Sequence, residues 1–336
     1  MRNNKKIWTS IIASLGLIIL ILDTKTALAG AKDGISLCLN SVIPSLFPFF
    51  ILSTLIAASL TGNPVRTLRP IGKLCGIPEG AESLLLLGLL GGYPVGAQSI
   101  NDAYRNKCIK NDDAHRLLGF CSNAGPAFIF GMIGGLFADK KALWALWFIH
   151  ILSALIVGCI LPRNRPSHCK LPSCSIISIP AALEISIRTM ANVCGWVILF
   201  RALLAFLQRW ILWFFPTELQ VMVAGLLELS NGCHTLYAVT NPGIRFVFSS
   251  CFLSFGGMCV AMQTISATRD IGTGLYFPGK LLQCAVSFLV SYISQHHLFS
   301  TDEIWKIPCA FLVVPACFLF ILPIYLNRKK VVAIPC

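Results

Sequence analysis

Charged residues are scarce in this sequence, and acidic ones especially so. Only 12% of the 336 residues are charged, with 14 acidic against 27 basic side chains, whereas 56% are apolar. A soluble protein of this length needs more polar surface, so the mean hydropathy of +0.75 indicates a bilayer protein. The basic residues lie in short segments between apolar runs, which argues against nucleic-acid binding and fits topology signals beside anionic lipid.

Sequence patterns typical of enzymes are also absent. There is no GxxxxGK[ST] loop, no HExxH motif and no arrangement of a nucleophile beside a base. The 15 cysteines include no CxxC pair and lie mostly inside apolar runs, which favours packing residues over disulfides or a metal site. We therefore expect no enzymatic activity, no catalytic residue, no bound metal and no cofactor.

Apolar runs long enough to cross a bilayer, about 20 residues each, recur along the chain. The uninterrupted runs cover residues 8–29, 42–60, 117–137, 142–161, 190–215, 219–240, 277–294 and 305–326. Two more, at residues 83–100 and 246–265, are interrupted by Gly-Gly. The expected fold is an all-α polytopic membrane protein with about eight transmembrane helices and two broken or re-entrant hairpin segments.

The N-terminus imitates a cleavable signal peptide, because basic residues and an apolar run precede Ala27-Leu28-Ala29. Since many spans follow, we favour an uncleaved N-terminal transmembrane helix at residues 1–30. With that end in the cytoplasm, the basic loop at residues 105–116 lies inside only if the segment at 83–100 enters the membrane and returns. The tail at 327–336 is then cytoplasmic as well.

The two Gly-Gly segments are near-copies of each other, LGGYPVGAQSI at residues 90–100 and FGGMCVAMQTI at residues 255–265. A weaker echo links LLGFCSNAG with LLELSNG, in swapped order along the chain. Internal repeats of this kind are typical of membrane transporters. We predict a first repeat at residues 31–161, a cytoplasmic linker at 162–180 and a second repeat at 181–326, parallel or inverted.

Residues at the interruptions are the candidate substrate-binding residues. Proline lacks an amide hydrogen and glycine has low helix propensity, so a Gly-Gly-Tyr-Pro run frees backbone groups at membrane depth. Such groups line a cavity for a polar substrate or ion, or else mark a close contact between helices. The candidates are Gly91, Gly92, Tyr93, Pro94, Gln98, Ser122, Asn123, Glu228, Ser230, Asn231, Gly256, Gly257 and Gln263.

Glu228 is the most costly of these residues, because an ionisable group at membrane depth costs at least about 2.5–3.5 kcal/mol. It should face the interior and contact a cation, a proton or a substrate, or else pair with Arg201 or Lys280. Gln98 and Gln263 occupy equivalent positions in the two copies. Their amides suit a neutral polar ligand or, alternatively, an interhelical hydrogen bond.

The runs GLLGGYPVGAQSI, CSNAGPAFIFGMIGG, GLLELSNG, FLSFGGMCVAMQTI and FPGKLLQ make this chain similar to the YlbJ-type sporulation integral membrane proteins. That family carries the nucleoside recognition domain, also called the Gate domain. The resemblance covers residues 36–326 and departs at Met258-Cys259, where a smaller or more polar pair is expected. It implies two Gate-like repeats and a multi-pass protein of the plasma membrane, in the mother-cell or forespore membrane of a spore former.

The leading hypothesis is a transporter-like or permease-like protein of sporulation with a polar site between the two broken segments. The alternative is a non-transporting membrane scaffold for spore envelope or cortex assembly. A transporter predicts water-accessible polar residues at mid-depth, whereas a scaffold predicts that these residues pair in a dry core. The expected partners are the lipid bilayer, with a small polar solute or ion and a homo-oligomer as candidates, and no nucleic acid.

Overall fold

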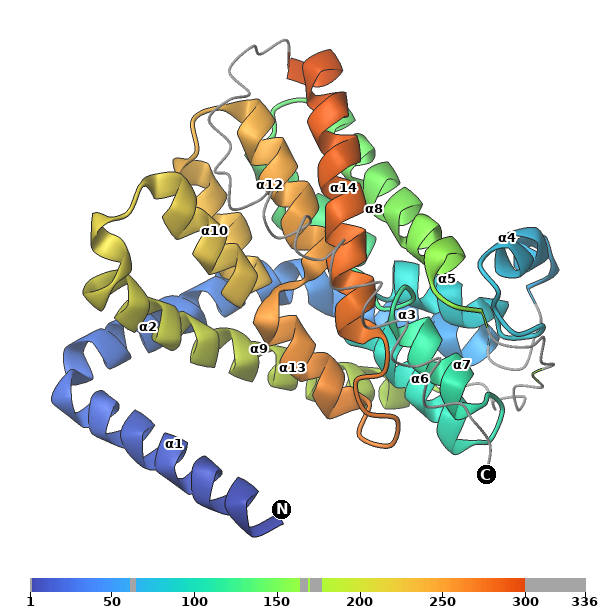
Figure 1. Ribbon diagram of the computed structural model, residues 1–336, viewed down its shortest axis with the longest axis horizontal. Helices are drawn as coiled ribbons and strands as arrows, with labels where there is room; N and C mark the ends of the chain where they lie inside the picture. Colours follow the sequence, from blue (N-terminus) through green and yellow to red (C-terminus); the bar gives the residue numbers. More distant parts are fainter. Residues whose placement is uncertain (1, 61–64, 164–168, 170–176, 300–336) are drawn as a thin grey trace.

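The computed structural model describes residues 2–60, 65–163, 169 and 177–299, and every regular element in that part of the chain is a helix (Figure 1). The expected all-α fold is confirmed there. The α-helices are α1 (Arg2–Leu22), α2 (Thr24–Leu37), α3 (Ile43–Leu60), α4 (Arg69–Leu74), α5 (Glu82–Leu90), α6 (Val95–Arg105), α7 (Asn111–Leu118), α8 (Lys140–Ile160), α9 (Ile179–Trp210), α10 (Thr217–Leu227), α11 (Leu229–Thr235), α12 (Pro242–Phe255), α13 (Gly257–Ala267) and α14 (Tyr276–Phe299). Short π- or 3-10 helical turns are η1 (Cys38–Val42), η2 (Arg66–Leu68), η3 (Ala127–Met132), η4 (Gly134–Leu136), η5 (Leu212–Phe214) and η6 (Leu236–Ala238).

Four helices in the described residues are long and apolar enough to cross a membrane. They are Thr24–Leu60, Lys140–Ile160, Ile179–Trp210 and Pro242–Ala267. Three predicted spans, at residues 42–60, 142–161 and 190–215, fall largely within these helices, and the one at 277–294 lies in α14. The chain therefore has the apolar helices of a membrane protein, although the count of about eight spans is not confirmed.

Three of the predicted spans are broken in the structure. The run at residues 8–29 bends between α1 and α2, where the Asp23 side chain accepts a hydrogen bond from the Thr26 amide and caps α2. The run at 117–137 is non-helical from residue 119 to residue 126, and the run at 219–240 is interrupted at Glu228. The predicted span at 305–326 and the tail at 327–336 lie outside the described residues, as does most of the linker at 162–180.

The two longest helical stretches, α2–α3 and α9, lie side by side and run across the molecule in Figure 1, above α1. Glycines allow the backbones to approach closely, because a Cβ on Gly30 would lie 2.8 Å from the Ala202 Cα atom. Arg201 of α9 forms an ion pair with Asp33 of α2 at 2.9 Å. Arg201 is therefore engaged within this helix pair and not with Glu228.

A second group of helices, α8, α12 and α14, packs together and lies above α2–α3 and α9 in Figure 1. Their shared interior belongs to the main apolar core, which includes Leu146, Val247, Phe252 and Phe288. The hydroxyls of Ser250 in α12 and Ser287 in α14 are 2.7 Å apart and bond to each other across the interface. This bundle fixes the positions of α8 and α14, which supply polar side chains to the candidate site.

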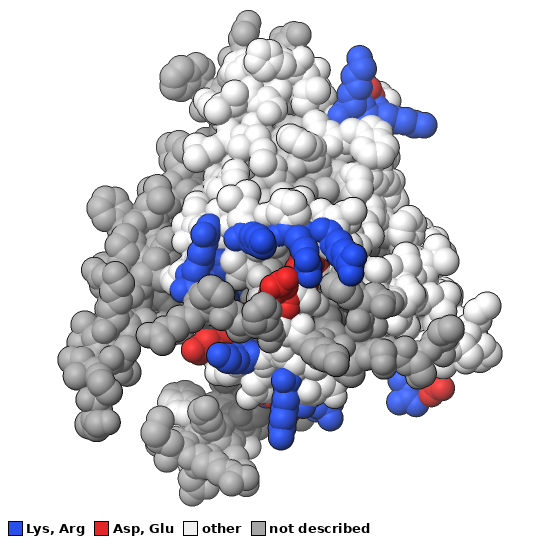
Figure 2. Space-filling view, turned by 90° about the vertical axis from the view of Figure 1, so that its right-hand side faces the viewer, with Lys and Arg blue, Asp and Glu red and all other residues white. Residues whose placement is uncertain are grey.

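Basic side chains gather on the face that carries α4, α6 and α7 (Figure 2). The exposed ones include Arg66, Lys73, Arg105, Lys107 and Lys110, which come from both basic loops expected on the cytoplasmic side. Their common face agrees with that expectation.

Arg116 is an exception among these basic residues, because only 2% of its surface is exposed. Its guanidinium donates to the main-chain oxygens of Cys75, Gly76, Gly158 and Pro162. Arg116 therefore ties the ends of α4 and α8 together instead of facing solvent.

Candidate functional site

The first Gly-Gly segment forms the turn of a hairpin between α5 and α6. Gly92 has a φ of +73°, in the left-handed region that glycine adopts without steric cost, and the Tyr93-Pro94 peptide bond is cis. A Cβ on Gly96 in α6 would lie 2.7 Å from the Gly88 Cα atom in α5, so the two helices run back against each other. The prediction that this segment turns back on itself agrees with this geometry.

The tip of this hairpin packs on the non-helical segment at residues 119–126. A Cβ on Gly92 would lie 3.0 Å from the Gly125 amide nitrogen, and a Cβ on Gly125 would lie 3.1 Å from the Leu90 oxygen. Only glycine fits at either position without a shift of the neighbouring backbone. The segment that contains Ser122, Asn123 and Gly125 is thus held against the turn at Gly91–Pro94.

A second hairpin joins α10 and α11, and its turn is Glu228. A Cβ on Gly225 would meet the Phe252 ring, while Gly232 lies against Gly225 across the hairpin. The predicted hairpin at Gly256-Gly257 is not found, because α12 and α13 continue as one broken helix over Pro242–Ala267. Gly256, with a φ of +81°, marks only the break in that helix.

Glu228 acts as the cap of α11. Its carboxylate accepts hydrogen bonds from the Ser230 amide at 2.9 Å, from the Asn231 amide at 2.6 Å and from the Asn231 side-chain amide at 2.7 Å. The side chain is 2% exposed. No basic side chain of the described residues lies within ion-pair distance of it, so the alternative pairing with Arg201 or Lys280 is not formed. Oriented amide groups, and not a counter-ion, balance the carboxylate.

Lys280 near the start of α14 lies fully buried beside the non-helical segment. Its ammonium donates to the Asn123 Oδ1 atom at 3.1 Å and to the Gln283 Oε1 atom at 2.7 Å. It also lies 5.3 Å from the centre of the Tyr93 ring, within the range of a cation–π contact. A charged group is thus held near the hairpin tip by amide oxygens and an aromatic face.

His150 of α8 extends this network on the other side of Asn123. The Ala124 amide donates to the His150 Nε2 atom at 3.1 Å, and the Nδ1 atom lies 3.4 Å from the Ser254 hydroxyl. Because Nε2 accepts, the proton of the neutral imidazole resides on Nδ1. The Gln283 side-chain amide also donates to the Asn123 Oδ1 atom at 3.0 Å. Polar groups from α8, α14 and the 119–126 segment therefore form one buried network.

The breaks of the two halves meet at Tyr93. The Tyr93 hydroxyl donates to the Leu253 oxygen at 3.5 Å, and a Cβ on Gly256 would lie 3.2 Å from the same hydroxyl. Gly257 in turn lies against the Glu228 amide nitrogen, at 3.4 Å from a Cβ built on it. A cavity of about 40 Å³ opens at this meeting point, and its wall includes Gly91, Gly92, Tyr93, Gly125, Glu228, Ser230 and Gln263.

Most of the predicted residues are therefore brought together, but Gln98 is not. It is half-buried and lines a different cavity from Gln263, so the two equivalent glutamines do not share a site. The Gln263 side-chain amide lies 3.4 Å from the Cys259 sulfur. Ser122 is fully buried, and its hydroxyl has no hydrogen-bond partner among the described residues.

Sequence reasoning missed Gln283 and treated Lys280 and His150 as secondary. The signal was present, because Lys280 and Gln283 are separated by one helical turn at the start of an apolar run and so share a face. Polar residues inside such runs normally face the interior of a bundle. What the sequence does not show is that α14 lies beside residues 119–126.

Comparison with known proteins finds a relative that is similar over most of its length. The chain is 27% identical to the sporulation integral membrane protein YlbJ of Bacillus subtilis over 335 residues, covering 84% of this chain and 81% of that protein. No family model and no solved structure matches the chain. The Gate domain and the internal duplication therefore stay predictions, whereas a membrane location follows from this relative together with the apolar helices. The similarity over most of both chains confirms the resemblance to YlbJ-type sporulation integral membrane proteins.

Proposed function

We propose that this chain is a transporter-like or permease-like membrane protein of sporulation, with its polar site where the chain breaks meet at Tyr93. The observation that carries the proposal is this convergence. The turn at Gly92, the non-helical segment at Gly125, the cap at Glu228 and the break at Gly256 all border one small cavity or contact its wall. Interrupted helices that meet in the interior are the usual way in which a membrane protein holds a polar solute or ion.

The chemistry of this site suits a small polar ligand. It offers a carboxylate at Glu228 and hydroxyl groups at Tyr93 and Ser230, with the Lys280 ammonium behind the Tyr93 ring. A cavity of about 40 Å³ has room for roughly one water molecule or ion. A larger solute would therefore require the hairpin of α5 and α6 to move away from residues 119–126.

The further parts of the proposal follow from the resemblance. The site would belong to a Gate domain in two repeats, at residues 31–161 and 181–326, and the protein would act in the mother-cell or forespore membrane. It would bind and move its ligand without a catalytic step. The exposed apolar side chains of the helices could be covered by lipid or by other copies of the chain in a homo-oligomer.

A membrane scaffold for spore envelope or cortex assembly is the second candidate, and one observation favours it. The buried polar groups mostly bond to one another, as in the contacts of Lys280 with Asn123 and Gln283 and of Glu228 with Asn231. A scaffold needs such a dry, satisfied core. A scaffold does not need the breaks in both Gly-Gly segments or the cavity beside them. We therefore rank transport first.

Ligand-dependent thermal stabilisation of the purified full-length protein tests the proposal. The wild type is screened against nucleosides, metal ions and small metabolites, and each hit is repeated with Glu228→Gln, with Gln263→Ala and with the control Glu184→Gln. Glu184 is exposed and paired with Arg188 on the surface of α9, so its change should leave every shift intact.

A shift that Glu228→Gln or Gln263→Ala abolishes would support the site, and uptake of the same compound into proteoliposomes would support transport. If no compound stabilises the wild type, the scaffold is favoured. A hit that survives both variants would place ligand binding elsewhere in the protein and contradict the proposed site.

A further inference from the structure

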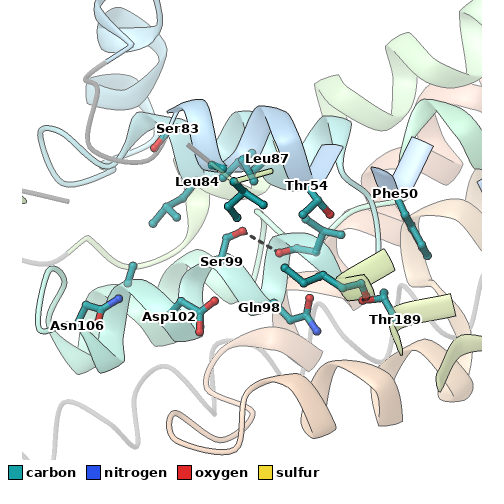
Figure 3. Close-up of a pocket in the computed structure, with 16 residues that line it drawn as sticks. Phe50, Thr54, Ser83, Leu84, Leu87, Gln98, Ser99, Asp102, Asn106 and Thr189 are labelled. Carbon is teal, nitrogen blue, oxygen red and sulfur yellow. Dashed lines mark hydrogen bonds between the residues drawn. The ribbon is translucent and has the colours of Figure 1, made fainter. Parts of the chain in front are cut away.

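A second and larger cavity adjoins the site at Tyr93. Its volume is about 300 Å³, and it lies among α3, α5, α6 and α9 (Figure 3). Phe50 of α3 lines both cavities, so its ring forms part of the wall between them. The space equals roughly ten water molecules, which is enough for a small organic solute.

The polar side of this cavity is one face of α6. Four polar residues of this helix line the cavity, namely Gln98, Ser99, Asp102 and Asn106 (Figure 3). Asp102 lies three or four residues from each of the others, so they share one side of the helix. The Ser99 hydroxyl donates a hydrogen bond to the Val95 main-chain oxygen at 3.0 Å. The remaining three side chains offer a carboxylate and two amides to whatever occupies the cavity.

The opposite side is mostly apolar, with Thr54, Thr189 and Ser83 as its polar residues. Phe50, Leu84 and Leu87 supply the hydrocarbon surface there. Ser83 of α5 also lines the cavity, its residue is 1% exposed and its hydroxyl has no hydrogen-bond partner among the described residues. A buried hydroxyl without a partner costs free energy that a polar ligand atom would recover.

The charge of the cavity is unexpected for this chain. Basic residues outnumber acidic ones by 27 to 14, yet Asp102 is the one charged residue that lines the cavity in the described part of the chain. The nearest basic neighbour on the same helix, Arg105, forms its ion pair with Asp270 at 3.6 Å instead. Burial raises the pKa of the Asp102 carboxyl, and the nearby Asp270 carboxylate adds to this rise while Arg105 opposes it.

We propose that this cavity binds a small organic cation, a primary amine with a short hydrocarbon body and a second polar end. The ammonium bonds to the Asp102 carboxylate and to an amide oxygen of Gln98 or Asn106. The body lies on Leu84, Leu87 and Phe50, and the second polar end reaches the free hydroxyl of Ser83. Binding here does not depend on transport through the Tyr93 site.

Three probes of equal length and different charge test this assignment. They are 4-amino-1-butanol, 1,4-butanediol and 4-hydroxybutyrate, a cation, a neutral molecule and an anion. Thermal unfolding of the full-length wild type is followed against increasing concentrations of each. We expect 4-amino-1-butanol alone to raise the melting temperature in a saturable way. Equal effects of the cation and the diol, or no effect of the cation, would overturn the proposal.

Variants then locate the site. Asp102→Asn should weaken the apparent affinity for 4-amino-1-butanol about tenfold or more, because a charge-assisted hydrogen bond is lost. Asp112→Asn, an exposed carboxylate on the neighbouring α7, is the matched control and should change nothing. Glu228→Gln should also leave this binding intact, which separates failure of this proposal from failure of the Tyr93 site. An unchanged affinity in Asp102→Asn would refute the assignment. If Asp102→Asn does not fold, the comparison of the three probes on the wild type still tests the proposal, because it needs no variant.

Discussion

Replacement of Gly92 by alanine should strongly destabilise the protein. The added Cβ atom would be strained by the left-handed backbone and would also clash with a neighbouring segment. The φ of +73° at Gly92 is a left-handed conformation that costs an L-residue about 1–2 kcal/mol. The added Cβ would also lie 3.0 Å from the Gly125 nitrogen and 3.2 Å from the Gly125 Cα atom, so two backbone segments must separate. Overpacking of this kind costs about 1 kcal/mol or more, and the expected loss is therefore about 2–3 kcal/mol.

Gly195→Ala is the matched control for this change. Gly195 lies inside α9, and nothing is within 4 Å of a Cβ built on it. Alanine there should be neutral or should stabilise the helix by about 0.5–1 kcal/mol. The two variants add the same methyl group, so their difference isolates the meeting point of the hairpin with residues 119–126.

Thermal unfolding of both variants in the same detergent measures this difference. Gly92→Ala should melt roughly 4–12 °C below the wild type if the shift per kcal/mol resembles that of large soluble domains, whereas Gly195→Ala should melt at or above it. Any ligand found for the Tyr93 site should also stabilise Gly92→Ala less. Equal melting temperatures for the two variants would refute the close contact between Gly92 and Gly125, and with it the convergence on which the proposed function depends.

Three further predictions concern single side chains. Glu228→Ala should lower the free energy of unfolding by about 1–3 kcal/mol, because three buried N–H groups lose their acceptor. Chemical or thermal unfolding measures this loss, and the exposed control Glu184→Ala should stay close to the wild type. Arg116→Met should cost about 3 kcal/mol or more, since it leaves the buried oxygens of Cys75 and Gly158 without a donor; a variant as stable as the wild type would contradict the role of Arg116 as a tie between helices. Binding of 4-amino-1-butanol should fall as the pH is lowered through the pKa of Asp102, which burial raises above the ordinary 3.8, and Asp102→Asn should remove this pH dependence.

The sequence predicted the breaks at both Gly-Gly pairs but not their different shapes. The first pair is followed by Tyr93-Pro94, and proline has no amide hydrogen with which to continue a helix. The second is followed by Met258-Cys259, which both have amide hydrogens, and α13 begins at once. Near-identical letters thus produce a hairpin in one place and a broken helix in the other, and the two residues after Gly-Gly explain the difference.

Glu228 illustrates what a buried charge in a sequence can and cannot reveal. Its cost at membrane depth correctly indicated an interior position. The alternative of a partner in Arg201 or Lys280 was wrong, because the carboxylate instead caps the amides of Ser230 and Asn231 at the start of α11. Glutamate is not among the usual N-cap residues, and the apolar periodicity extends over the break, so no local pattern in the sequence indicated this role. The site at Lys280 depends on contacts distant in the sequence, which no local pattern specifies.

The energetics of Lys280 bear on the choice between transport and a scaffold. A fully buried ammonium held by two neutral amide oxygens has lost its water without gaining a counter-charge. Replacement of buried charges by well-packed apolar residues is often neutral or stabilising, so a charge of this kind contributes little to a merely rigid core. A scaffold would be served equally well by methionine at this position. A transporter gains from a charge that lies behind the Tyr93 ring, because this charge sets the electrostatic potential of the Glu228 cavity and changes its contacts when the hairpin moves. The cost of burying Lys280 therefore favours a site that uses its charge.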